Sequence, residues 1–194
     1  MKFCSQCGAE VIIRVPADDN RERYICDSCD TVHYQNPKVI TGCIPVWDDK
    51  ILLCRRAIEP RSGFWTLPAG FMELGETITE AALRETLEEA DARVAILNLY
   101  VVLTLPHVNQ VHMLFRSRLQ DLNYKAGAET TEVNLFAEDE IPWSELAFGS
   151  IRHTLKFYFA DRKKDKYPLH VGDLVKAGNE FVLRPGPADD QLID

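Results

Sequence analysis

The sequence predicts an α/β domain preceded by a small cysteine-rich module. Segments rich in β-branched and aromatic residues, which are typical of strands, alternate with two stretches of helical periodicity, and this pattern predicts the α/β class. Two Cys-x2-Cys pairs near the N-terminus predict the separate module. The expected strands of the main domain are 39–47, 51–54, 94–105, 111–119 and 133–137, and the expected helices are 78–90 and 151–164.

Four cysteines define the N-terminal module, which is expected to span residues 1–36. The spacing between the two pairs is typical of a zinc ribbon, in which two tight turns present thiolates to a tetrahedral Zn²⁺. A core this small needs a metal to stabilise it, although disulfides and free thiols are alternatives. His33 is a further candidate ligand, and short strands are expected at 11–15 and 23–25. The cysteines are Cys4, Cys7, Cys26 and Cys29, with 18 residues between the pairs.

Charge excludes several classes of function. The whole chain of 194 residues carries a net charge of −8, which argues against a general nucleic-acid or anionic-membrane surface. The cysteine module holds four basic and six acidic side chains, so a structural or dimer-supporting role is favoured over nucleic-acid binding.

No apolar run has the length of a transmembrane helix, and the start MKFCSQCG is unlike a signal peptide. Six cysteines in such a chain indicate a reducing compartment, and we expect a cytoplasmic protein.

The segment 70–92 combines a glycine loop with a strongly acidic helix. Thr77 and Glu80 have the spacing of a capping box, so the helix is expected to run from about Ile78 to about Ala90. Seven acidic side chains in this segment face one arginine, Arg84, which gives a sum of −6 out of −8 for the whole chain. No lysine occurs between Lys50 and Lys125, so nearby lysines do not balance these charges.

The helical period separates an apolar side from an acidic side. Leu83, Leu87 and Ala90 fall on the apolar side. Carboxylates about 6 Å apart repel by roughly 3 kcal/mol at an effective dielectric constant near 20, and a hard cation such as Mg²⁺ or Mn²⁺ would relieve this repulsion. A solvated helix surface is the alternative. The carboxylates on the acidic side are Glu85, Glu88 and Glu89.

This segment resembles the Nudix hydrolase signature, G-x5-E-x7-R-E-U-x-E-E-x-G-U, in which U is a bulky apolar residue. Thr86 and Ala92 stand where bulky aliphatic residues are usual, and Asp91 replaces the second glycine. These positions support packing and the turn after the helix, so altered packing is expected rather than lost chemistry. The positions that match are Gly70, Glu76, Arg84, Glu85, Glu88 and Glu89.

The resemblance implies a Nudix α/β/α sandwich with a mixed sheet over residues 37–166, followed by strand and coil over 167–194. It also implies a homodimer and the hydrolysis of a nucleoside diphosphate linked to another moiety, which leaves two monophosphates. In that frame Glu76 and Arg84 form an ion pair that orients the metal-binding glutamates. The implied ligands of Mg²⁺ or Mn²⁺ are Glu85, Glu88, Glu89 and the carbonyl of Gly70.

Two further roles remain open within this resemblance. Glu88 or Glu89 is a candidate general base, and Glu129 and Glu132 are rivals, because Nudix bases often come from a loop after the signature. The alternative for both rivals is surface charge. Arg56 is expected to meet a substrate phosphate, with an exposed cation at the end of a strand as the alternative.

Two zinc-ribbon subgroups of the family suggest different substrates. NADH pyrophosphatases carry an S-Q-P-W-P-F-P motif after the signature, and nothing similar occurs between residues 92 and 122. The sequence is more similar to the plant chloroplast FAD and ADP-ribose pyrophosphatases, through YQNPKV, LLCRR, WTLPAGF, LFAEDEIP and LAFGSI. Pro106 also lies near the offset of a proline found in ADP-ribose hydrolases. FAD and/or ADP-ribose are therefore the expected substrates, with NADH hydrolysis and a non-catalytic ligand sensor as alternatives.

Several packing details complete these expectations. Cys43 and Cys54 lie within strands and are expected to be buried free thiols. Trp65 is expected to pack beneath the glycine loop, and Ser150 to cap the last helix. The apolar stripe of that helix should belong to the core and consists of Ile151, Leu155, Tyr158 and Phe159.

Overall fold

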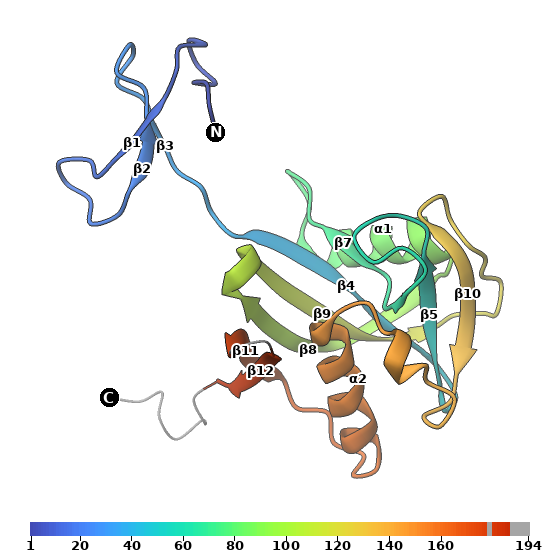
Figure 1. Ribbon diagram of the computed structural model, residues 1–194. Helices are drawn as coiled ribbons and strands as arrows, with labels where there is room; N and C mark the ends of the chain where they lie inside the picture. Colours follow the sequence, from blue (N-terminus) through green and yellow to red (C-terminus); the bar gives the residue numbers. More distant parts are fainter. Residues whose placement is uncertain (178–179, 187–194) are drawn as a thin grey trace. The chain divides into compact units, whose positions relative to one another are not determined.

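The computed structural model describes residues 1–177 and 180–186. The chain forms two compact units, residues 1–37 and 38–194, which are treated separately below (Figure 1). No helix in the described ranges is both long and apolar enough to cross a membrane.

The first unit is a small antiparallel sheet with the order β1-β2-β3. β1 (Ile12–Arg14) pairs with β2 (Arg23–Ile25), and both confirm strands expected from the sequence. β3 (Val32–His33) pairs with β2 and was not predicted, since two residues are too short to show an alternating pattern. Cys26 directly follows β2 and is fully buried, so the sheet delivers a thiol into the interior of the unit.

The second unit is built on a mixed sheet with the order β10-β5-β4-β9-β8-β11-β12, in which β6 pairs with β5 and β7 with β4. β4 runs parallel to β9, and β8 runs parallel to β11, while the other pairs are antiparallel. The strands are β4 (Lys38–Trp47), β5 (Lys50–Arg56), β6 (Trp65–Thr66), β7 (Ala69–Phe71), β8 (Val94–Leu105), β9 (Gln110–Leu119), β10 (Thr130–Phe136), β11 (His170–Ala177) and β12 (Glu180–Pro185).

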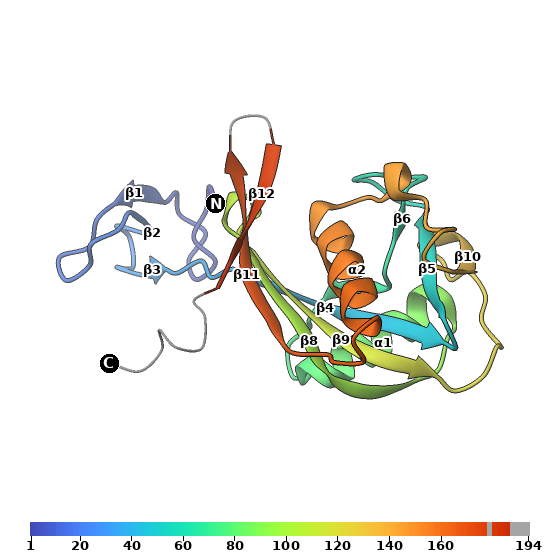
Figure 2. The ribbon, with the colours of Figure 1, turned by 90° about the horizontal axis from the view of Figure 1, so that it is seen from below.

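Two α-helices cover opposite faces of this sheet, as Figure 2 shows. They are α1 (Ile78–Ala90) and α2 (Gly149–Arg162), and two short 3₁₀ turns lie at Pro106–Val108 and Trp143–Glu145. Consecutive residues of β4 point to opposite faces, so Cys43 packs with α1 and Ile44 packs with α2. This arrangement confirms the predicted α/β/α sandwich with a mixed sheet.

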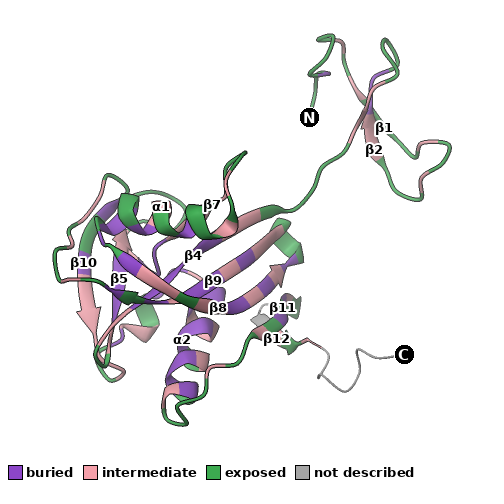
Figure 3. Cartoon of the chain, turned by 180° about the vertical axis from the view of Figure 1, so that it is seen from behind, coloured by how far each residue is buried: buried purple, intermediate pink, exposed green. Residues whose placement is uncertain are grey.

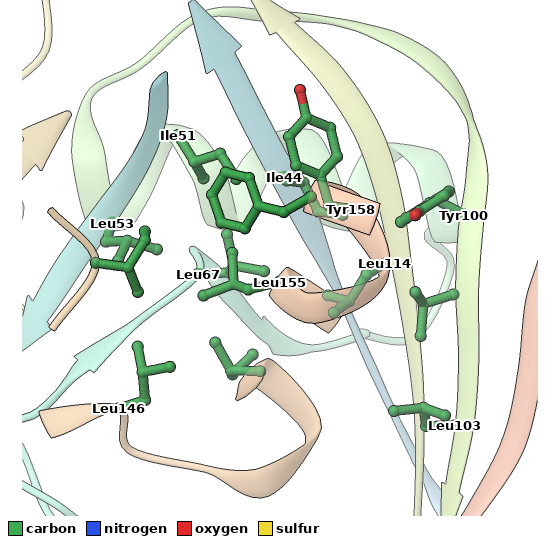
Figure 4. Close-up of a cluster of buried hydrophobic side chains, with 14 of the residues drawn as sticks. Ile44, Ile51, Leu53, Leu67, Tyr100, Leu103, Leu114, Leu146, Leu155 and Tyr158 are labelled. Atoms are coloured by element: carbon green, nitrogen blue, oxygen red, sulfur yellow. The ribbon is translucent and has the colours of Figure 1, made fainter. Parts of the chain in front are cut away.

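The larger core lies between the sheet and α2 (Figure 4). Ile44, Leu114 and Leu155 are fully buried there, and Tyr100 adds an aromatic side chain whose hydroxyl donates to Asp161 at 2.6 Å. The smaller core on the α1 side contains the buried, unpaired thiols of both strand cysteines, as predicted. The predicted apolar stripe of α2 is also confirmed, since Ile151, Leu155, Tyr158 and Phe159 are all buried.

The packed face of α1 differs from the apolar side expected from the sequence. Leu83 and Leu87 are 37% and 47% exposed, and Figure 3 shows exposed residues along the outer face of this helix. The side chains that α1 turns to the sheet are small, which allows the helix to approach the strands closely. Because the helical period allows either face to be buried, the large leucines misled the prediction. The buried residues of the helix are Ala81, Ala82, Thr86, Glu89 and Ala90.

Two of the three departures from the family signature, at Thr86 and Asp91, are accommodated by the structure. The hydroxyl of Thr86 is fully buried and donates to the carbonyl of Ala82 at 2.7 Å, so it leaves no unsatisfied group. Asp91 adopts the left-handed conformation, with φ 45° and ψ 30°, at the position where the signature has glycine. The predicted capping box of Thr77 and Glu80 is present at the other end.

α2 begins differently from the prediction. Its N-cap is Phe148, which makes no side-chain cap hydrogen bond, and Ser150 lies inside the first turn. The expected cap by Ser150 is therefore wrong, because the helix begins one residue before it. After α2, β11 and β12 extend the sheet, in agreement with the strand expected in the C-terminal segment. Part of the coil expected there falls on residues 187–194, which lie outside the described residues.

Candidate functional site

A cavity of about 910 Å³ opens in the second unit. Its walls come from the end of β5, the glycine strand β7, α1, the loop before β10 and the first turn of α2. The sheet brings these segments together although they are far apart in the sequence. Seven of the residues predicted for the site line this cavity, namely Arg56, Gly70, Arg84, Glu85, Glu88, Glu89 and Glu129.

Arg84 forms ion pairs with three glutamates of the acidic cluster. Its Nε and Nη2 donate to the carboxylate of Glu76 at 2.6 and 3.0 Å, and this pairing holds the pKa of Glu76 down at about 2. Its Nη1 donates to Glu85 at 2.7 Å and to Glu88 at 3.0 Å. Its Nη2 also reaches the carbonyl of Phe71 at 3.0 Å, so the guanidinium ties β7 to the helix.

The three candidate metal ligands have different surroundings. Glu89 is 7% exposed, and its Oε2 accepts a hydrogen bond from the backbone N–H of Ala69 at 3.2 Å. Burial raises the pKa of Glu89 to about 8, and burial also raises the pKa of Glu85. The side chain of Glu88 is 59% exposed. The cluster therefore contains a buried carboxyl that can hold a proton, at Glu89, and a solvent-exposed carboxylate, at Glu88.

Glycines allow the backbone to approach this cluster closely. A Cβ added to Gly70 would lie 2.3 Å from Oε2 of Glu85, so only glycine leaves room for the carboxylate beside β7. A Cβ on Gly127 would lie 1.7 Å from the backbone oxygen of Glu88. The N–H of Gly127 donates to the carbonyl of Glu89 at 3.0 Å, which fastens the loop before β10 to the end of α1.

The donor chemistry of the cluster fits a hard divalent cation. Three carboxylates and the neighbouring backbone of Gly70 offer only oxygen, which Mg²⁺ and Mn²⁺ prefer. A single guanidinium pairs with the three carboxylates of Glu76, Glu85 and Glu88, so negative charge is left over. Arg84 forms ion pairs with two of the three glutamates, Glu85 and Glu88.

The two rival base candidates are separated by the structure. Glu129 lines the cavity, and its charge acts on both Glu85 and Glu89. Glu132 lies outside the cavity lining, where it pairs with Arg55 at 3.4 Å and accepts a hydrogen bond from Asn134 at 2.7 Å. Of the two, only Glu129 is placed to meet a ligand in the cavity.

Arg56 lies at the end of β5 and also lines the cavity. Its Nε donates to the carbonyl of Pro60 at 2.9 Å, and its guanidinium carbon lies 5.3 Å from the centroid of the Phe148 ring. Its positive charge lowers the pKa of Glu89, in opposition to burial. Within the described ranges no ion pair to Arg56 is found, so its charge is available to an anion.

Several lining residues were not found from the sequence. His112 is 6% exposed, and burial lowers its pKa to about 4, so it is neutral near pH 7. Its Nε2 lies 3.1 Å from Oε1 of Gln110. Phe71 and Phe148 add aromatic surface to the walls. His112 lies in none of the motifs noted above, whereas Phe71 ends WTLPAGF and Phe148 lies in LAFGSI. Their place in the cavity wall could not be read from these motifs, because strand pairing and the packing of α2 bring the three residues together.

The cysteine site of the first unit has the geometry of a tetrahedral thiolate centre. Zn–S distances of about 2.3 Å place neighbouring sulfurs roughly 3.8 Å apart. Sγ of Cys4 lies 3.7 Å from that of Cys29, and Cys7 lies 3.4 Å from Cys26, distances that exclude disulfides. All four sulfurs lie within 4.8 Å of one another. Nε2 of His33 lies 3.3 Å from Sγ of Cys4, where a ring N–H would donate to a thiolate.

Comparison with known proteins identifies both units. Residues 2–35 match the family described as Nudix N-terminal, a zinc ribbon, and residues 36–159 match the NUDIX domain. The crystal structure of a NUDIX hydrolase from Nitrosomonas europaea is 57% identical, covers 91% of this chain and 100% of its own, and superposes with a TM-score of 0.88.

Curated relatives carry two kinds of name. An ADP-ribose pyrophosphatase of Methanocaldococcus jannaschii is 34% identical over 121 residues, which are 59% of this chain and 69% of that protein. An NAD-capped RNA hydrolase NudC of Vibrio vulnificus is 30% identical over 149 residues, which are 73% of this chain and 53% of that protein. The chain thus spans about half the length of that NudC relative. Together with the NUDIX match over most of the chain, the signature helix and the fold, these findings show that this protein belongs to the Nudix hydrolase family, with a zinc-ribbon module at its N-terminus.

Proposed function

We propose that this protein is a metal-dependent pyrophosphatase that hydrolyses the diphosphate linkage of ADP-ribose and/or FAD to two monophosphates. The observation that carries the proposal is the cavity of about 910 Å³, whose wall contains both the acidic cluster of α1 and the guanidinium of Arg56. That volume lies at the upper end of small-molecule sites, as a dinucleotide requires. The relative named ADP-ribose pyrophosphatase supports the choice of substrate.

The residues that would hold Mg²⁺ or Mn²⁺ are Glu85, Glu88 and Glu89, with the carbonyl of Gly70. A divalent cation bound there would neutralise phosphate charge and lower the pKa of a water molecule. Arg84 fixes Glu85 and Glu88 through the contacts given above, and Glu76 fixes Arg84 in turn. These two residues therefore orient the ligands.

Glu129 is the base that we favour. A water molecule attacks one phosphorus atom, its proton passes to the carboxylate of Glu129, and the bond from that phosphorus to the bridging oxygen breaks. Glu88 and Glu89 remain candidates for the same role. Arg56 would stabilise the charge on the other phosphate, and the aromatic walls at Phe71 and Phe148 would hold the flavin, adenine or ribose portions.

A second candidate is the hydrolysis of NADH or of NAD-linked RNA ends. The NudC relatives favour it by name, and the zinc ribbon matches a Nudix N-terminal family. The net charge of −8 and the missing S-Q-P-W-P-F-P motif argue against it. We further propose that the protein is cytoplasmic, because the zinc thiolates need a reducing compartment, and that it forms a homodimer as its resemblance to the family implies.

A substrate panel tests the proposal. The full-length protein is incubated with Mg²⁺ or Mn²⁺ and, separately, with ADP-ribose, FAD, NADH and an RNA with a 5′ NAD cap, and the products are identified by mass. We expect the highest kcat/KM with ADP-ribose or FAD, and AMP as a common product. A preference for NADH or capped RNA over both would overturn the choice of substrate. Salt-sensitive DNA binding without any hydrolysis would instead support a sensor.

A further inference from the structure

The first turn of α2 forms part of the wall of the cavity. Phe148, Gly149, Ser150 and Ile151 line it consecutively. The first N–H groups of an α-helix have no partner within the helix, and the aligned peptide dipoles make this end positive. Here the N-cap residue Phe148 contributes no side-chain cap, and the first turn contains no acidic residue. A 14-residue helix thus presents unneutralised donors beside the cavity.

A buried hydroxyl in the same turn points to a ligand independently. Ser150 is 0% exposed and lines the cavity, and its Oγ has no hydrogen-bond partner among the described residues. A buried hydroxyl without a partner is destabilising, so such a group calls for an explanation. Rotation about the Cα–Cβ bond moves this hydroxyl between staggered positions. Thr154, one turn later, is also buried and unpartnered, but it lies outside the cavity lining and so provides a matched control.

The charges around this turn favour an anion over a neutral group. The guanidinium of Arg56 lies 5.3 Å from the ring centroid of the N-cap residue Phe148, and its charge also reaches Glu89 in the acidic cluster. An anion held at the start of α2 would therefore lie near a cation, while another phosphate of the same diphosphate faces the glutamates. The turn is held in place, because the N–H of Ala147 donates to the carbonyl of Trp65 at 2.8 Å.

We propose that the first turn of α2 and the hydroxyl of Ser150 form, with Arg56, a subsite for the phosphate that is not attacked during hydrolysis. This inference rests on the proposed pyrophosphatase function. The subsite would keep the phosphate that leaves with the nucleotide and so set the direction in which the diphosphate lies across the glutamates. Ser150 is then a residue that determines substrate binding, and it lies outside the signature at residues 70–92.

The test compares Ser150→Ala with Thr154→Val in the full-length protein. Each variant removes one unpartnered buried hydroxyl, so both should keep or slightly raise the melting temperature. Binding of AMP is measured by titration calorimetry, and steady-state kinetics are measured with ADP-ribose. We expect Ser150→Ala to weaken AMP binding by about tenfold and to raise KM more than it lowers kcat, as the loss of a hydrogen bond to an anion predicts. Thr154→Val should stay within about twofold of the wild type.

The outcomes separate the subsite from the reaction. If Ser150→Ala binds AMP as the wild type does, or if Thr154→Val is weakened equally, the subsite is wrong even when ADP-ribose is hydrolysed. If AMP binding depends on Ser150 but no dinucleotide is hydrolysed, the subsite stands and the proposed reaction is wrong. A wild-type protein that does not bind AMP overturns the subsite.

Discussion

Arg84 donates two hydrogen bonds to the carboxylate of Glu76, from Nε at 2.6 Å and from Nη2 at 3.0 Å. The remaining face of the same guanidinium holds Glu85 and Glu88. One side chain therefore sets the positions of two candidate metal ligands and ties them to the loop before α1.

Arg84→Lys should lower turnover by about a hundredfold or more while leaving the fold intact. A lysine keeps the charge but replaces a planar fork with a single ammonium, so it cannot hold three carboxylates at once. Steady-state kinetics over a range of Mg²⁺ concentrations will show the change as a higher Mg²⁺ concentration needed for the half-maximal rate, together with a lower kcat. An Arg84→Lys enzyme with wild-type kinetics would mean that the guanidinium does not position the ligands.

The buried carboxyl of Glu89 predicts a pH-dependent stability for the metal-free protein. Its pKa is about 8 in the folded state and near 4.5 when exposed. Between these values the folded protein keeps a proton that the unfolded chain has lost. The free energy of unfolding should therefore fall as pH rises from about 4.5 to 8, by at most about 1.4 kcal/mol per pH unit from this group.

Urea titrations in the presence of a chelator, repeated from pH 5 to pH 8, measure this slope. Glu89→Gln removes the titrating group and should flatten the slope, and it should also lower kcat by orders of magnitude. Glu145→Gln, at an exposed position in a 3₁₀ turn, is the control and should change neither quantity. If the slope of Glu89→Gln equals that of the wild type, the titration belongs to another group.

Two glycine substitutions should fail in different ways. In Gly70→Ala the new methyl group meets the carboxylate of Glu85, which can swing aside, so we expect a loss of activity of at least about tenfold with little change in melting temperature. In Gly127→Ala the methyl group meets the backbone of α1 at Glu88, which cannot yield, so a loss of stability of a few kcal/mol is expected. Calorimetry and activity assays on both variants distinguish these results. Equal loss of stability in both would contradict the geometry.

Glu129→Gln and Glu132→Gln form a matched pair on the question of the base. Glu129 lines the cavity, so its amide variant should lower kcat by about 10² to 10⁴. Glu132 is exposed and pairs with Arg55, so its variant should remain within about twofold of wild-type activity. A pH–rate profile of each variant checks the result, because loss of the base removes the acidic limb. Normal turnover by Glu129→Gln would return the role to Glu88 or Glu89.

The N-terminal unit should lose its fold when the thiolate site is broken. Cys26→Ser removes a fully buried ligand, so the chain should no longer retain the one equivalent of zinc expected for the wild type, and residues 1–37 should become sensitive to protease. Cys54→Ala, at a buried thiol of the second unit, is the control and should keep the metal. Metal analysis measures the zinc content of each variant, and limited proteolysis measures its protease sensitivity. Zinc retained by Cys26→Ser would show that the four thiolates are not the site.

Local patterns predicted much of this fold. The bounds of α1 and its capping box follow from Thr77 and Glu80, because a cap is a short-range hydrogen-bond pattern. The cysteine spacing likewise predicted that the four sulfur atoms lie close together, as they do. The buried face of α1 was not predictable in the same way, since Leu83 and Leu87 are exposed while a carboxylate is buried. Tertiary packing decides which side of a helix meets a sheet, and helical periodicity alone cannot.

In the candidate site, too, local patterns predict some residues and only tertiary packing identifies the others. The six residues that match the signature lie within 20 positions, and sequence spacing alone identifies them. Glu129 and Glu132 are indistinguishable in the sequence, and only the pairing of β10 with β5 separates them. Ser150 was noted only as a helix cap and as part of LAFGSI, and His112 was not noted at all, because only the packing of a helix start and of a strand from elsewhere in the chain brings them to the cavity.

The loop before β10 is anchored at two points on the last turn of α1, through Lys125 to Ala90 and Gly127 to Glu89. Its earlier portion, from residue 120 to residue 124, lies upstream of both anchors. Insertions or deletions there can accumulate without moving Glu129, whereas a change of one residue after Gly127 would shift it. Natural and engineered variants of this protein should therefore differ in length before the anchors and keep a constant length behind them.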